Sequence, residues 1–172
     1  MSLSMYDASV PVFVSQLKKL DALLDKAVDS GVPESEIMES RIFGDMLPFP
    51  KQIQIACDSA KGAMARLTGT ENPSMPDTET SLAELKARIA KTIAYVDSFK
   101  PDQLADAGDR KVEVKFPGLE MAWAGRDYLR QYAMPNFFFH VSIAYGLLRM
   151  KGVKIGKGDF LPVDPSAIVR MG

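Results

Sequence analysis

Three separate stretches of this chain carry apolar residues at a spacing of three and four positions. That spacing is typical of a helix that buries one face against a protein core. The stretches predict a first helix over roughly residues 5–29, a second over residues 50–69 and a third over residues 81–99. Ser81 and Glu84 have the spacing of a capping box at the start of the third helix. A chain with several such faces has to pack helix against helix.

The pattern changes between Lys111 and Trp123, where apolar residues alternate with charged or small ones on either side of Pro117-Gly118. This alternation predicts a small β-hairpin with its turn at Pro117-Gly118. A nearly all-apolar fourth helix is expected to follow, from about residue 126 to residue 151. Pro135 lies inside it and should bend it, freeing the carbonyl group of Gln131.

These elements predict one domain over residues 1–172. The expected fold class is all-α, an antiparallel four-helix bundle with the small β-hairpin before the last helix. Residues 34–48 are expected to form a long connection with one helical turn, and residues 70–80 a polar, proline-containing loop.

The charge balance restricts the partners that this chain is expected to have. With 21 basic and 22 acidic residues the net charge is −1, so we expect neither a nucleic-acid-binding surface nor a polybasic membrane patch. No apolar run approaches the ~18–20 residues of a membrane-spanning helix, and the first residues lack the charged start of a signal peptide. Cys57 is the sole cysteine, which excludes an intramolecular disulfide and fits a reducing compartment. We therefore expect a cytoplasmic protein.

The only histidine, His140, stands among aromatic and aliphatic residues in the fourth predicted helix. Burying an imidazole without a partner costs on the order of 1–3 kcal/mol, so His140 should meet a hydrogen-bond partner, a metal or a ligand. It shares one helix face with Asn136 and Ala144, four positions away on either side. Candidate partners are Asn136, Cys57 and the carbonyl group freed at Pro135. A core histidine and a functional pocket both remain open.

On the second predicted helix, Cys57 lies on the inward stripe and is flanked by polar side chains. If the second and fourth helices are neighbours, a thiol, an imidazole and a carboxamide converge between them. The pocket candidates are Gln54, Cys57, Asp58, Lys61, Asn136, His140 and Tyr145. The alternative is structural: Cys57 is a small core residue, Asp58 and Lys61 are solvated, and Tyr145 fills space.

Three runs of sequence resemble an uncharacterised bacterial and fungal family that is grouped with the DinB-like (YfiT-like) superfamily of metal-dependent bundles. They are the start from Tyr6-Asp7 to Leu17, the run Gln52–Gly62, and the run Pro135–Tyr145 with its continuation through Leu148-Arg149, Gly152 and Ile155-Gly156-Lys157 to Asp159-Phe160-Leu161. The resemblance covers nearly the whole chain.

The resemblance implies a four-helix bundle in which three histidines bind a divalent metal, one from the second helix and two from the fourth. This chain has only one histidine. His140 matches one ligand of the fourth helix, Asn136 or Ala144 falls at the other, and Cys57 or Asp58 lies near the position on the second helix. Carboxamides are poor ligands for zinc or nickel, so a reduced site would use His140, Cys57 and Asp58 to hold zinc, nickel or manganese. The other reading is that no metal binds.

Two functions follow from this resemblance. The first is a small-molecule-binding or non-catalytic dimeric protein with a degenerate metal site. The alternative is a metal- or thiol-dependent transferase or hydrolase with its pocket between the second and fourth helices. We expect a homodimer because apolar side chains surround more of the fourth helix than a bundle interior covers. These residues are Phe137, Phe138, Phe139, Ile143, Tyr145 and Leu147. The alternative is that the connection over residues 34–48 or the hairpin covers this surface within one chain.

Overall fold

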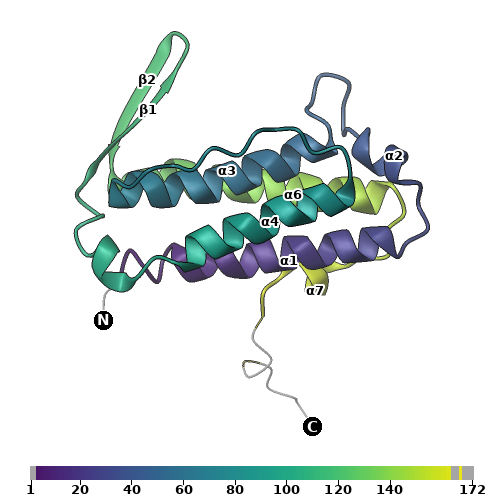
Figure 1. Cartoon of the computed structure of the whole chain (residues 1–172), viewed down its shortest axis with the longest axis horizontal. Coiled ribbons are helices and arrows are strands. Elements are labelled where there is room, and N and C mark those ends of the chain that lie inside the picture. Colours follow the sequence, from purple (N-terminus) through teal and green to yellow (C-terminus); the bar gives the residue numbers. More distant parts are fainter. Residues whose placement is uncertain (1–2, 164–166, 168–172) are drawn as a thin grey trace.

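The computed structural model describes residues 3–163 and residue 167, and most of them are helical. Four helices are long, and shorter helices and one hairpin connect them (Figure 1). The long helices are α1 (Val10–Val28), α3 (Phe49–Thr68), α4 (Leu82–Asp97) and α6 (Met134–Met150). The other elements are α2 (Glu34–Met38), η1 (Pro101–Leu104), β1 (Lys111–Phe116), β2 (Leu119–Ala124), α5 (Gly125–Tyr128), η2 (Leu129–Ala133) and α7 (Lys157–Phe160).

The long helices pack against one another along their apolar faces. α3 lies between α6 and α4, and α4 also packs on α1 (Figure 1). The predicted stripes face this core, since side chains such as Leu20, Ile53 and Ile89 are fully buried. The expectation of a mainly helical chain with one two-stranded antiparallel sheet is confirmed.

Residues 69–81 form an extended segment, which we call the strap, between α3 and α4. It runs back along α3 (Figure 1): Lys61 in the second half of α3 donates to the carbonyl of Pro73, and Lys51 near its start pairs with Asp77 at 2.9 Å. Thirteen extended residues reach roughly 40 Å, more than the roughly 30 Å length of α3. α4 therefore starts at the same end as α3 and runs parallel to it. The prediction that all neighbouring helices are antiparallel is wrong for this pair.

The N-terminal boundary of the first helix also differs from the prediction. α1 begins at Val10, and the residues before it form turns rather than helix. Pro11 lies in the first turn of α1 and has no N–H group to bond to the carbonyl of Asp7, which favours a start at this point. The hairpin is confirmed, with Phe116 opposite Leu119 across the turn.

The last long helix is not uniform. Residues 125–150 are helical, but η2 is a π-helical turn between α5 and α6. This wide turn ends two residues before Pro135, whose ring nitrogen cannot donate to the carbonyl of Gln131. The irregularity that the proline predicts is present, and it takes the form of one wider turn.

Gly125 lies at the junction of the hairpin and α5, where two backbone segments touch. A Cβ atom on Gly125 would lie 1.9 Å from the backbone oxygen of Ala107 and 3.0 Å from a methyl group of Leu67. The oxygen belongs to the backbone of Ala107 and cannot move aside as the end of a flexible side chain could, so only glycine fits there.

We expect Gly125→Ala to lower the free energy of unfolding by about 1–3 kcal/mol, because the backbone must shift to admit the methyl group. Gly146→Ala is the matched control: Gly146 lies inside α6 with nothing within 4 Å of its Cβ position. That change should raise stability by up to about 1 kcal/mol. Chemical denaturation measures both, and equal effects would contradict the close approach at Gly125.

Candidate functional site

α3 carries polar side chains on two different faces. Gln52 and Ser59 are seven positions apart and bond to side chains of α6. The second set contacts α4 and the strap, and it consists of Gln54, Cys57, Asp58 and Lys61. The helix therefore separates the predicted pocket residues into two groups.

His140 faces α3, and it is 9% exposed. Its Nδ1 atom lies 2.8 Å from Oε1 of Gln52, while Nε2 of Gln52 donates to the carbonyl of Leu47 at 2.9 Å. The second bond identifies Oε1 of Gln52 as an acceptor, so Nδ1 of His140 carries the proton. The lone pair of the ring is then on Nε2.

The partner of His140 is none of the three that the sequence suggested. Asn136 donates instead to Oγ of Ser59 at 2.7 Å, and Cys57 contacts α4. Gln52 stands at the start of the run that carries the family resemblance, but its amide cannot be matched to His140 without knowing how α3 and α6 are aligned. Burial lowers the pKa of His140 below its ordinary value of 6.5, so the imidazole is neutral at pH 7.

Cys57 is fully buried in the core between α3 and α4. Burial raises the pKa of its thiol to about 12, and this outweighs the opposing effects of a hydrogen bond with Thr92 and the charge of Arg88. Because the thiolate is the nucleophilic form, this cysteine is inert at neutral pH. The structural interpretation of Cys57 is the one that its surroundings favour.

Arg88 in α4 is the residue that organises the second group, and its side chain is only 2% exposed. Its guanidinium nitrogens lie 3.0 Å from carboxylate oxygens of Asp58, Asp77 and Glu79. Gln54 also donates to Glu79, at 2.9 Å. Burial alone would raise the pKa of Glu79, but hydrogen bonds from Arg88 and Gln54 lower it below the ordinary value. These groups join α3, α4 and the strap.

Arg88 was not among the predicted site residues, although the sequence contains a signal for it. It stands on the apolar stripe of α4 next to the buried Leu85 and Ile89. A guanidinium at such a position needs carboxylate partners. The strap carries these partners, but its path cannot be inferred from the stripe.

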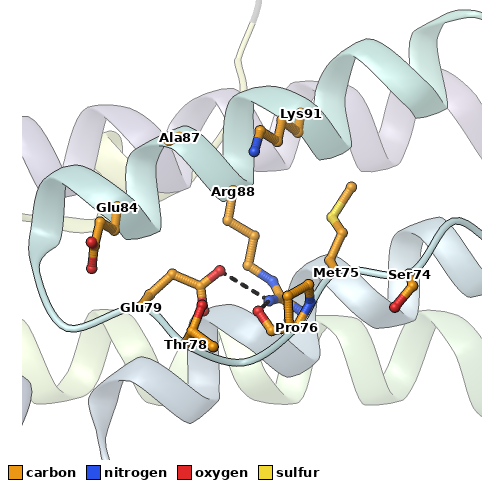
Figure 2. A pocket seen from close by; sticks show the side chains of 9 residues that line it. All are labelled: Ser74, Met75, Pro76, Thr78, Glu79, Glu84, Ala87, Arg88 and Lys91. Atoms are coloured by element: carbon orange, nitrogen blue, oxygen red, sulfur yellow. Dashed lines mark hydrogen bonds and ion pairs between the residues drawn. The ribbon is translucent and has the colours of Figure 1, made fainter.

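A crevice opens between the strap and α4, directly over Arg88 (Figure 2). Its volume is about 340 Å³, within the range of small-molecule sites. The lining residues come from these two segments only: Ser74, Met75, Pro76, Thr78, Glu79, Glu84, Ala87, Arg88 and Lys91. Asp58 and Gln54 form the layer beneath it through their bonds to Arg88 and Glu79.

The structure does not bring the predicted metal ligands together. Cys57 and Asp58 contact α4 and Arg88, whereas His140 contacts Gln52. No group of three His, Cys, Asp or Glu side chains in residues 3–163 is arranged to hold a metal ion. Tyr145 belongs to neither group, since its ring packs against Phe160 of α7 at 5.7 Å between centroids.

Residues 5–161 match the family described as "Domain of unknown function (DUF1993)". The chain belongs to the DUF1993 family. A solved structure of a DinB family member protein from Shewanella denitrificans is 36% identical to this DUF1993 chain, with a TM-score of 0.83. The likeness covers 94% of this chain and 93% of that one. No curated protein matches this chain.

The residues of this DUF1993 chain do not fit the three-histidine metal site of the wider superfamily. His140 is the single imidazole, and the carboxamides of Gln52 and Asn136 are engaged in hydrogen bonds with side chains or backbone. Ala144 offers no donor atom. Neutral amides are weak ligands for zinc and nickel.

In the part of the chain that the structure describes, no helix is both long and apolar enough to cross a bilayer.

The lowered pKa of His140 predicts how the stability of this DUF1993 protein depends on pH. Just below pH 6.5 the unfolded chain binds a proton on His140 that the folded chain does not bind. This residue should therefore lower the free energy of unfolding as the pH falls through 6.5 toward the lower pKa of the folded state. His140→Gln should show a smaller loss between about pH 7 and about pH 5. Equal losses in both proteins would contradict a depressed pKa.

Proposed function

We propose that this DUF1993 chain is a DinB-like four-helix bundle that binds a small molecule in the crevice between the strap and α4 and catalyses no reaction. The crevice is the observation that carries the proposal. It is concave, about 340 Å³ in volume, and has a rigid floor in which Arg88 is held by three carboxylates. Sites of this kind bind ligands without reorganising their own charged groups.

The protonation and ion pairing of the potentially reactive side chains support a binding protein. The thiol of Cys57 is buried with a pKa of about 12, and the carboxylates around Arg88 are engaged in ion pairs. General acid–base catalysis requires a group whose pKa lies near the working pH and which can reach a substrate. Neither Cys57 nor Glu79 meets this requirement in the crevice.

The alternative is a metal- or thiol-dependent transferase or hydrolase that acts between α3 and α6. The lone pair on Nε2 of His140 favours it, because such a nitrogen accepts a proton or ligates a metal. The buried thiol of Cys57 and the amide neighbours of His140 weigh against it.

The proposed homodimer now has a smaller candidate surface. Phe137 and Leu147 are buried within the chain, and Phe138 and Ile143 pack against its core. Phe139 is 53% exposed. A contact between two copies through Phe139 stays a prediction, and it is independent of the crevice.

The crevice is tested by NMR titration of the labelled protein with two small probes, 2-propanol and N-methylacetamide. We expect shift changes in residues 74–79 and 84–91, because the crevice offers both probes a concave surface. Ala87→Phe fills the crevice and should remove these changes. Ala90→Phe, an exposed position on α4 that does not line it, should leave them intact.

Shift changes that cluster around His140, or that spread evenly over the surface, would contradict the proposal. Zinc added as a third probe tests the alternative directly. Stoichiometric binding that perturbs His140 and disappears in His140→Ala would support a metal-dependent enzyme instead.

A further inference from the structure

Two side chains of opposite charge, Glu84 and Lys91, lie at opposite ends of the crevice (Figure 2). They are seven residues apart on α4, so they share a face and are separated by roughly 10 Å along the helix. Glu84 accepts hydrogen bonds from the backbone and hydroxyl of Thr80 but pairs with no cation among residues 3–163. Lys91 likewise forms no ion pair within the described residues.

The floor between these ends is electrically balanced. Arg88 faces the carboxylates of Asp58, Asp77 and Glu79, and two of these acids also pair with Lys61 and Lys51. Three cations and three carboxylates therefore offset one another. A ligand meets free charge only at the two ends, negative at Glu84 and positive at Lys91.

Between the charged ends the lining is mixed: Met75, Pro76 and Ala87 offer apolar surface beside the polar side chains of Thr78, Glu79 and Arg88. Ala87 lies on the Glu84 side of Arg88, Met75 lies on the Lys91 side, and Pro76 is next to the guanidinium (Figure 2). A ligand that matches this pattern has a cationic end, a middle with both polar groups and apolar surface, as in a peptide, and an anionic end. In an extended peptide each residue spans roughly 3.3 Å, so three residues place the terminal ammonium and carboxylate groups roughly 10 Å apart.

We propose that the crevice binds a short zwitterion of the length of a tripeptide, with its ammonium group at Glu84 and its carboxylate group at Lys91. This inference rests on the proposed function, because it names the ligand class of the same site. The side chain of the middle residue contacts the apolar lining residues Ala87, Pro76 and Met75. A ligand with a single charge leaves one end of the crevice unpaired and binds more weakly.

Calorimetric titration with alanyl-methionyl-alanine tests the proposal, and the peptide's N-acetylated and C-amidated forms serve as partners in a thermodynamic cycle. Removing one terminal charge should weaken binding about twofold to fivefold. Lys91→Gln should weaken binding of the free peptide by the same factor but leave the C-amidated form unaffected. Glu84→Gln keeps a side-chain acceptor for Thr80. It should weaken binding of the free peptide by the same factor but leave binding of the N-acetylated form unaffected.

Two matched controls accompany the cycle. Lys18→Gln removes an exposed charge elsewhere and should change nothing, and Ala87→Phe should abolish binding. The ligand class is wrong if the modified peptides bind as tightly as the free one. It is also wrong if Lys91→Gln leaves binding of the N-acetylated form unaffected and weakens binding of the C-amidated form. If the peptide fails to bind while 2-propanol and N-methylacetamide still map to the crevice, the ligand class fails and the proposed function stands. If none of the probes bind there, both fail.

Discussion

The ion pairs of Arg88 are the interaction on which the arrangement of this molecule depends. The strap is polar and rich in proline, so it has little apolar surface to bury and cannot be held on the helices by packing alone. Desolvating a guanidinium is costly unless carboxylates face it. Asp77 and Glu79 of the strap supply two of them and Asp58 of α3 the third. The strap can therefore lie along α3, and α4 can start at the same end as α3.

This geometry also determines what α3 can contribute to a site. One face of the helix meets α6, where Gln52 fixes the tautomer of His140. Another face meets α4, where Cys57 and Asp58 are held. A site that used the thiol and the imidazole together would need both on one face. The strap instead forms one wall of a separate crevice, which lies over α4 rather than between α3 and α6.

The sequence predicted the parts of the fold that depend on local pattern. The stripes located the long helices, and Ser81 does cap α4 by accepting the N–H of Glu84 at 3.2 Å. The reciprocal half of the capping box differs, since Glu84 accepts from the backbone of Thr80. Period and capping are properties of neighbouring residues, which explains why they can be read without a structure.

The features that the sequence did not predict depend on how the helices are oriented and aligned relative to one another. A polar connection of this length permits either a parallel or an antiparallel α3–α4 pair, and the contacts that the strap makes with α3 and with Arg88 decide between them. The pairing of His140 with Gln52 could not be predicted for the same reason, because it requires the alignment of α6 on α3.

Of the seven predicted pocket residues, Gln54, Cys57, Asp58 and Lys61 do gather in one place, around Arg88 and Glu79 beneath the crevice. Asn136, His140 and Tyr145 lie elsewhere.

The role of Arg88 can be measured directly through the backbone mobility of the strap. Order parameters from ¹⁵N relaxation should be about 0.8 for strap residues in the natural protein and should fall below about 0.6 in Arg88→Gln, with α1 and α6 unchanged. The glutamine side chain keeps much of the volume but removes the charge that holds the two strap carboxylates. A strap that stays as rigid in Arg88→Gln as in the natural protein would show that other contacts hold it, and would contradict the central position given to Arg88.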